Sequence, residues 1–402
     1  MDLRLTPEEN AFRAEVRAFI RDNLPAEIRE RMRLGYYPLK SEVVTWQRIL
    51  NKKGWAATCW PKEWGGPGWT PIQRMIFLEE NLMAPAPELS PFNINMLGPV
   101  LLQFGTEAQK RRFLPRAANM DDWWCQGFSE PGAGSDLANL RTAAKLEGDT
   151  YVVNGQKIWT STAHDADWCF LLVRTNPQAA KRQEGISFLL VDMKTPGIEV
   201  RPIISIDGNH HLNEVFFTDV KVPAENLVGK ENTGWTIAKF LLGNERTGIA
   251  QLGKSKDRAN FSRWLAREVR MNGKPLIEDR GFRTRVAQLE VDLKALEITQ
   301  MRVVSGQDKA QDASKPDPLS SVLKIRGTEL QQGTTELAMD TGGTPVMAVW
   351  QRELSAAVNE PALGPDWAPG LATEYLFLRA ASIYGGTNEI QKNILNKAVL
   401  GL

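Results

Sequence analysis

Residues 126–136 read Gln-Gly-Phe-Ser-Glu-Pro-Gly-Ala-Gly-Ser-Asp, and they form the most chemically specific segment of the chain. Gly132 and Gly134 permit positive φ angles and a close approach between the backbone and a ligand. Ser129 and Ser135 add short hydroxyl groups on either side of the glycines. The stretch therefore predicts a loop that binds an anionic or strongly polar ligand, and a plain surface turn is the alternative.

The stretch matches a Gly-x-Gly-x-x-Gly dinucleotide loop only in part, because the third glycine position is Leu137. Farther along the chain, Asn154-Gly155 stands between the β-rich residues 151–153 and 157–159. An Asn-Gly pair in this setting predicts a β-hairpin, whereas a Rossmann unit requires a helix there. We therefore expect a ligand-binding loop in a β domain.

The overall composition is that of a globular protein. The chain has 402 residues, and its 49 basic and 48 acidic side chains leave a net charge of +1. This balance argues against nucleic acid and against an anionic membrane surface as partners. Cys59, Cys125 and Cys169 have neither disulfide nor zinc spacing, so we expect no metal site. The N-terminus lacks an apolar signal core and no run reaches transmembrane length, so we expect a cytoplasmic protein.

The predicted elements divide the chain into three parts. Residues 1–120 show helical spacing, which begins with a cap formed by Thr6 and Glu9. Residues 121–231 contain short β-like runs separated by Gly, Pro and Asn, and residues 232–402 are helical again. The sequence therefore predicts a multidomain α+β protein with an N-terminal α domain, a middle β domain and a C-terminal α domain.

Residues 235–252 have an apolar stripe if they form one helix. Leu242, Ile249 and Leu252 lie on this stripe, and so does Glu245. A carboxylate on an apolar face is costly unless it is paired or used, and burial raises its pKa toward the range of a general base. Two interpretations stay open from the pattern, an ion pair with a nearby arginine and a catalytic base.

The same region contains a literal match to a phosphate-binding loop, from Gly248 to Ser255. A functional loop of this kind follows a buried strand and is not helical, whereas this match continues the helical stripe. Nucleotide hydrolysis through this segment is therefore a disfavoured alternative.

Several stretches, in the right order, resemble the acyl-CoA dehydrogenase family along nearly the whole chain. They are residues 60–66, 104–106, 112–115, 129–136, 154–159 and 384–390. The resemblance implies a helical N-terminal domain, a β-barrel-like middle domain and a C-terminal four-helix bundle. It also implies bound FAD, oxidation of an acyl-CoA thioester to the trans-2-enoyl-CoA, and an electron-transfer flavoprotein or similar acceptor as a partner.

The resemblance assigns roles to individual residues by their positions. The residues expected to bind FAD are Gln126, Phe128, Ser129, Ser135, Trp159, Thr160, Ser161, Thr387 and Glu389. The residues expected to contact the substrate are Ser135, Arg246 and Gly385.

Many members of the family carry the catalytic base at the position that is Gly385 here, and glycine has no side chain that could act as a base. In the branch that resembles isovaleryl-CoA and long-chain acyl-CoA dehydrogenases, the base lies at the position of Glu245. The helical stripe had already singled out this residue. We therefore expect Glu245 to remove the α proton and the backbone N–H of Gly385 to help hold the thioester oxygen.

Positions that in this family complete the FAD site of a neighbouring subunit are altered, and they are Val269, Asn272 and Met339. The loss of these FAD contacts suggests an α₂β₂ heterotetramer with a related subunit. In this respect the chain resembles the large subunit of bacterial heteromeric acyl-CoA dehydrogenases of the pimeloyl-CoA dehydrogenase type. A homotetramer or homodimer is the simpler alternative. The alternative to an active dehydrogenase is a catalytically silent partner subunit of a heteromeric acyl-CoA dehydrogenase.

Overall fold

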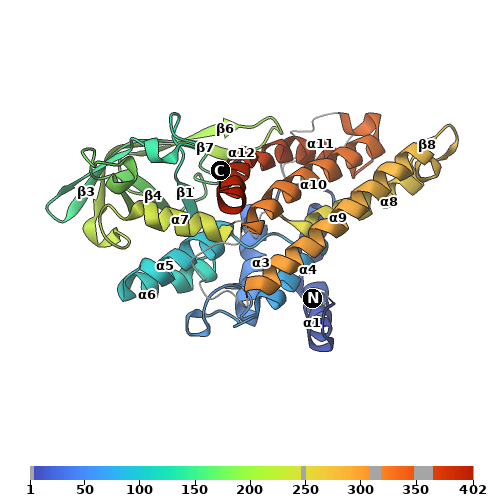
Figure 1. Cartoon of the computed structure of the whole chain (residues 1–402), viewed down its shortest axis with the longest axis horizontal. Coiled ribbons are helices and arrows are strands. Elements are labelled where there is room, and N and C mark those ends of the chain that lie inside the picture. The colour runs from blue at the N-terminus through green and yellow to red at the C-terminus, as the bar shows by residue number, and fades with distance from the viewer. Residues whose placement is uncertain (1–3, 246–249, 308–317, 348–364, 402) are drawn as a thin grey trace.

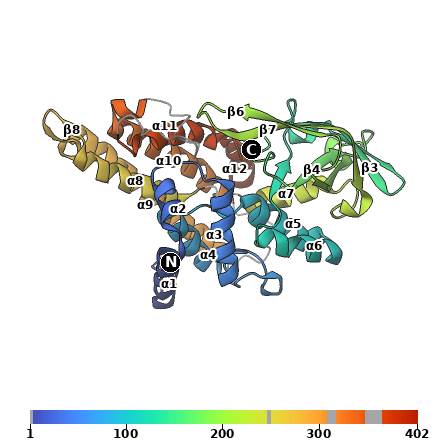
Figure 2. The same ribbon diagram turned by 180° about the vertical axis from the view of Figure 1, so that it is seen from behind.

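The computed structural model describes residues 4–245, 250–307, 318–347 and 365–401. A sheet lies at one end of the long axis, and the helices of the C-terminal part extend to the other end (Figure 1). Figure 2 shows the N-terminal helices α1 to α4 between these two ends. The helical, sheet and helical parts confirm the predicted fold class. None of the helices in the described ranges is long and apolar enough to cross a membrane.

The N-terminal part is helical, as predicted. Thr6 and Glu9 form the expected capping box, in which the Thr6 hydroxyl accepts the Glu9 N–H at 3.2 Å. The helices of this part are α1 (Pro7–Asn23), α2 (Ala26–Arg33), α3 (Lys40–Lys53), η1 (Lys62–Trp64), α4 (Pro71–Met83), η2 (Phe92–Leu97), α5 (Gly98–Phe104) and α6 (Glu107–Ala118).

The middle part is one curled sheet with the strand order β1-β4-β2-β3-β7-β6, and β5 pairs with β4. Alternate residues of β4 enter two apolar clusters, Phe170 on the face toward the N-terminal helices and Leu171 on the other face. The strands are β1 (Trp124–Gly127), β2 (Ala143–Glu147), β3 (Thr150–Lys157), β4 (Trp168–Arg174), β5 (Ile186–Asp192), β6 (Ile198–Ile204) and β7 (His210–Pro223).

The hairpin predicted at Asn154-Gly155 is wrong, because both residues lie inside β3. The register of β3 against β7 shifts between Val153 and Gly155, so this pair forms a bulge. Asn154 exchanges two hydrogen bonds with Asp219 of β7, at 3.0 and 2.9 Å. Cross-strand bonds of the Asn side chain therefore replace the turn that the dipeptide predicts.

The C-terminal part contains α7 (Gly234–Glu245), α8 (Leu252–Glu268), α9 (Arg280–Gln307), α10 (Leu319–Gly342), α11 (Ala368–Phe377) and α12 (Asn388–Leu395). A single helix over residues 235–252 is wrong, because α7 ends at Glu245 and Gln251 has a left-handed φ of 41° just before α8. Helical spacing therefore relates Glu245 to Leu241 in α7, and it does not extend to Leu252 in α8.

A buried ion pair anchors the loop of residues 126–136 to the end of β3. Lys157 is fully buried, and its Nζ donates to Glu130 Oε1 at 2.8 Å and to the Phe128 carbonyl at 3.0 Å. The Glu130 carboxylate also accepts the backbone N–H groups of Arg141 at 2.6 Å and Thr142 at 2.9 Å. Both buried charges are therefore hydrogen-bonded, which is the condition for tolerating them inside a protein.

Replacing Lys157 with Met should lower the free energy of unfolding by about 3–5 kcal/mol, because Glu130 loses its buried partner. Urea unfolding of the purified protein measures this change. The exposed pair of Lys145 and Glu147, at 2.9 Å, provides the control. Lys145→Met should leave the unfolding midpoint unchanged. Equal midpoints for the two variants would contradict the anchoring role of Lys157.

Two glycines of α10 should respond in opposite ways to alanine. A Cβ at Gly327 would lie 2.5 Å from the Ala250 Cα, so Gly327→Ala should destabilise the protein by about 1–3 kcal/mol. A Cβ at Gly333 meets only Leu289 Cδ1 at 3.7 Å, so Gly333→Ala should stabilise it by about 0.5–1 kcal/mol. Parallel thermal and urea unfolding of both variants tests whether α10 approaches the start of α8 closely.

Candidate active site

The loop of residues 126–136 leaves the edge strand β1 and folds into a tight turn. Glu130 and Ala133 exchange two backbone hydrogen bonds of 3.0 Å. Gly132 and Gly134 do not have positive φ, so that expectation was wrong. A Cβ added at either glycine meets no atom within 4 Å. Their role in this structure is to leave the backbone uncovered rather than to supply a left-handed conformation.

The exposed side of this loop presents unpaired backbone donors. The N–H groups of Gly132, Gly134, Ser135 and Asp136 find no acceptor among the described residues. A row of free N–H groups around glycines forms a concave site for an anion. These donors could serve an anionic or strongly polar ligand, and ligand binding by this loop stays a prediction.

The segment of residues 158–162 lies against this loop. The Ile158 N–H donates to the Ser129 carbonyl at 2.9 Å, directly after the buried Lys157. Trp159 has a φ of 60°, and the residue is 56% exposed. A large aromatic ring in a left-handed conformation is strained, and such residues cluster at ligand sites. The chain thus places an exposed indole beside the glycine loop.

Thr160 is buried, and its hydroxyl has no hydrogen-bond partner among the described residues. Both backbone polar groups of Thr160 are hydrogen-bonded. Its N–H donates to the Asn213 carbonyl, and its carbonyl accepts a hydrogen bond from Asn213 Nδ2, both at 3.0 Å. A buried hydroxyl without a partner is costly unless a ligand satisfies it. This orphan group, the free N–H groups and the exposed indole fit a flat polar cofactor with phosphates.

The other predicted FAD residues occupy different environments. Gln126 and Ser129 are half-buried, Ser135 is exposed and Ser161 is half-buried. The ring of Phe128 packs in the core against Phe170 and Phe188, so only its backbone faces the loop.

Thr387, Glu389 and Gly385 lie around the start of α12. The Thr387 hydroxyl caps α12 by accepting the Ile390 N–H at 3.2 Å, and Glu389 is exposed in the first turn. Gly385 has a φ of 63°, and its N–H has no acceptor among the described residues. Along the long axis, α12 lies between the sheet and the far end of α8 and α9 (Figure 1).

Glu245 is the last residue of α7, one helical turn after the buried Leu241. Arg246 lies outside the described residues, and so does Gly248, the first residue of the phosphate-loop match. The described end of that match belongs to helix α8, and Lys254 pairs with Glu374 at 3.4 Å. A phosphate-binding loop has no support in this arrangement.

All three histidines of the chain lie next to the 158–162 segment, a grouping that no local sequence pattern predicts. His164 and His210 stack with ring centroids 4.0 Å apart, and both contact Asn213. Burial lowers the pKa of His164, and the neighbouring His210 lowers it further. Burial also lowers the pKa of His211. The rings of His164 and His211 are therefore neutral near pH 7 and add no positive charge to the site.

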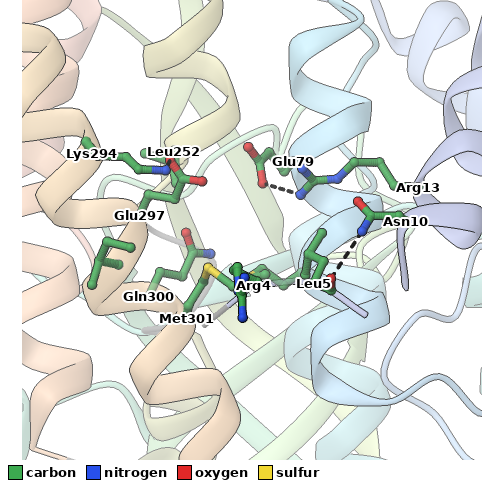
Figure 3. A pocket seen from close by; sticks show the side chains of 12 residues that line it. Arg4, Leu5, Asn10, Arg13, Glu79, Leu252, Lys294, Glu297, Gln300 and Met301 are labelled. Carbon is green, nitrogen blue, oxygen red and sulfur yellow. Dashed lines mark hydrogen bonds and ion pairs between the residues drawn. The ribbon is translucent and has the colours of Figure 1, made fainter. Parts of the chain in front are cut away.

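A hollow of about 560 Å³ lies elsewhere, between α1 and α4 on one side and α8 and α9 on the other (Figure 3). Ion pairs such as Arg13 with Glu79 at 3.3 Å and Lys294 with Glu297 at 3.2 Å surround it. None of the predicted site residues lines it. No group of three or more His, Cys, Asp or Glu in the described ranges could hold a metal ion.

Family models match most of the chain. The N-terminal, middle and C-terminal domains of acyl-CoA dehydrogenases match residues 6–121, 125–220 and 232–400. Acyl-CoA dehydrogenase IpdE1 of Mycobacterium tuberculosis is 39% identical over 400 residues, which cover 97% of both chains. Acyl-CoA dehydrogenase FadE26 of the same organism is 33% identical, covering 100% of this chain and 99% of the relative.

Solved structures agree with these relationships. The ChsE4-ChsE5 complex from Mycobacterium tuberculosis contains a chain with 32% identity and a TM-score of 0.83, covering 100% of this chain and 99% of that one. A structure described as the Tcur3481-Tcur3483 steroid ACAD gives 28% identity and a TM-score of 0.85 with the same coverage. The chain belongs to the acyl-CoA dehydrogenase family of oxidoreductases.

Proposed function

We propose that the protein is an FAD-dependent enzyme that converts an acyl-CoA thioester to the trans-2-enoyl-CoA. The observation that supports this most directly is the contact between the 126–136 loop and the 158–162 segment, with the unpartnered Thr160 hydroxyl beside them. Gln126, Ser129, Ser135, Trp159, Ser161, Thr387 and Glu389 would complete the cofactor site, with Phe128 contributing through its backbone. FAD supplies a hydride acceptor for the β hydrogen, which protein side chains lack.

We assign the base to Glu245 because position 385 is a glycine with a left-handed backbone. A Glu residue at position 385 would be strained at this φ. Glu245, the last residue of α7, can supply the carboxylate instead. Glu245 removes the α proton, and the free N–H of Gly385 stabilises the developing charge on the thioester oxygen. A single preorganised donor of this kind is worth about 10²–10³ in rate. Arg246 follows Glu245 directly and would contact the substrate.

The relation to a solved steroid ACAD favours a bulky, ring-bearing acyl group among the thioesters that the sequence leaves open. An electron-transfer flavoprotein or a similar acceptor would reoxidise the enzyme.

Glu245→Gln should retain the yellow chromophore but lose bleaching by acyl-CoA, with a rate lower by about 10²–10⁴-fold. Anaerobic stopped-flow absorbance measures this step. Glu27→Gln, at an exposed carboxylate in the first turn of α2, is the matched control and should bleach like the parent. Unchanged turnover in Glu245→Gln would remove Glu245 as the base. Colourless parent protein would instead favour the silent partner subunit.

We further propose an α₂β₂ assembly with a related subunit. Val269 directly precedes strand β8 (Arg270–Met271), and Asn272 lies in the turn between β8 and β9 (Lys274–Pro275). This hairpin lies at the opposite end of the molecule from the sheet (Figure 1). This tip is too far from its own 126–136 loop to serve it, so it would reach a neighbouring chain. The ChsE4-ChsE5 structure is described as a complex, and the description of the steroid ACAD likewise names two proteins, Tcur3481 and Tcur3483.

Native mass spectrometry of the protein, expressed alone and together with a related subunit, tests this assembly. Co-expression should give two copies of each chain with higher flavin content than the single chain. A homotetramer of this chain alone with one FAD per chain would contradict the proposed α₂β₂ assembly. It would not contradict the proposed dehydrogenation reaction.

A further inference from the structure

Asn213 of β7 is a fully buried polar residue that contacts the 158–162 segment. Its backbone carbonyl accepts the Thr160 N–H, and its side-chain Nδ2 donates to the Thr160 carbonyl, both at 3.0 Å. One residue of β7 therefore binds both backbone polar groups of Thr160, which is itself buried. Because a buried backbone group without a partner is costly, this double contact fixes the course of the chain at Thr160.

A bulge explains why a side chain takes part in this contact. The ladder between β3 and β7 ends with Lys157 opposite Val215, and the same register would place Trp159 opposite Asn213. Thr160 takes that place instead, one residue later, and Trp159 has a left-handed φ of 60°. An extra residue of this kind interrupts the regular backbone pairing. The Asn213 amide thus supplies a hydrogen bond at the point where the regular ladder has ended.

Fixing Thr160 also fixes the direction of Trp159. Side chains alternate along an extended chain, and here Thr160 is buried whereas Trp159 is exposed. The left-handed conformation of Trp159 is strained, and such a conformation persists only where the surrounding structure holds it. The contact between Asn213 and Thr160 is directly adjacent to the strained residue. It therefore holds the Trp159 indole on the outer side of the segment.

The groups around Asn213 determine which way its amide points. The Thr160 carbonyl needs a donor, so the amide nitrogen faces it and Oδ1 is left as an acceptor. His210 Nε2 lies 2.8 Å from Oδ1 and therefore carries a proton. His164 Nδ1 is closer to Nδ2, at 3.1 Å, than to Oδ1, at 3.3 Å. This nitrogen is therefore assigned as the unprotonated acceptor of the second amide hydrogen.

The two imidazoles support each other and the amide. Their rings stack with centroids 4.0 Å apart and planes 27° apart. The proton assigned to His164 Nε2 faces Asp165 Oδ2, at 3.6 Å between the heavy atoms. Lys40 Nζ in turn donates to the Asp165 carbonyl at 2.7 Å. All donors and acceptors of the Asn213 amide are satisfied, and a satisfied buried network specifies one arrangement.

Building on the proposed function, we propose that Asn213 is a positioning residue for the flavin, which it serves by holding Trp159 in the orientation that receives the ring. Asn213 does not touch the cofactor. His210 and His164 act one step farther out, because they orient the Asn213 amide. A segment that is ordered before the ligand binds loses less conformational freedom on binding, so this contact raises the affinity for FAD.

The affinity of the deflavinated protein for FAD tests this role, with the partner subunit present where co-expression requires it. Asn213→Ala removes the donor to the Thr160 carbonyl. It should weaken FAD binding by about tenfold or more and shift the absorbance and circular dichroism of the bound flavin. His210→Phe keeps a ring stacked on His164 but loses the bond to Oδ1, so it should weaken binding by about two- to fivefold. His210 is exposed, so this variant provides the test even where Asn213→Ala does not fold.

Asn154→Ala is the matched control. Asn154 also connects β3 to β7, through two hydrogen bonds with Asp219 at 3.0 and 2.9 Å, but it lies within the ladder rather than beside Trp159. The control should lower the thermal midpoint while the dissociation constant and the spectrum of FAD stay those of the parent. It separates a general loosening of the two strands from an effect on the flavin.

A double-mutant cycle tests whether the effect passes through Trp159. FAD affinity is compared in the parent, Asn213→Ala, Trp159→Ala and the double variant. If Asn213 acts by orienting the indole, Asn213→Ala should weaken FAD binding by much less in the Trp159→Ala background than in the parent. A purely structural role of Asn213 would give the same loss in both backgrounds.

The outcomes distinguish the positioning role from the proposed reaction. Parent-like FAD affinity in both Asn213→Ala and His210→Phe, an equal loss in Asn154→Ala, or the same loss in both backgrounds of the cycle would overturn the positioning role and leave the reaction intact. A parent that binds FAD with the expected dependence on Asn213 but oxidises no acyl-CoA would reject the reaction and keep the positioning role. A parent that binds no FAD would reject both.

Discussion

The Lys157 ammonium group is fully buried 2.8 Å from the Glu130 carboxylate, and the arrangement of the candidate site depends on this contact. Burial lowers the pKa of Lys157, and the charge of Glu130 opposes that effect. Burial alone would raise the pKa of Glu130, but Lys157 and the bonds from Thr142 and Arg141 outweigh it and hold that pKa below its ordinary value. Each charge is thus tolerable only because the other is present. The pair joins the glycine loop to the end of β3, so it also sets the position of Trp159 against that loop.

The candidate site combines residues held by the sheet with residues at helix ends. The edge strand β1 and the end of β3 belong to a sheet with apolar clusters on both faces, which provides a rigid support. Glu245, by contrast, stands at the end of helix α7, and Gly385 lies in a left-handed turn before α12, where its N–H has no acceptor among the described residues. The proposed roles of a carboxylate at position 245 and a backbone donor at position 385 are compatible, because the backbone donor does not depend on a side chain.

Two of the histidines beside the 158–162 segment are uncharged near pH 7, because burial lowers the pKa of His164 and of His211. In the C-terminal helices, Lys254 and Arg258 both pair with Glu374, at 3.4 and 2.7 Å. Two cations that share one buried carboxylate hold α8 and α11 together, because removing Glu374 would leave both without their partner.

The sequence by itself determined the three-part fold, the capping box of α1 and the glycine loop, because these depend on local spacing, turn chemistry and several ordered motifs. It also singled out Glu245, although through a helix that proved to end there. Only the tertiary structure decided that Asn154-Gly155 is a bulge, because the partner of Asn154 is Asp219 on another strand. It likewise decided the pairing of Lys157 with Glu130 and the contacts among the rings of Tyr37, His211 and Phe377. Contacts between residues far apart in the chain follow from packing and charge, and local pattern contains no information about them.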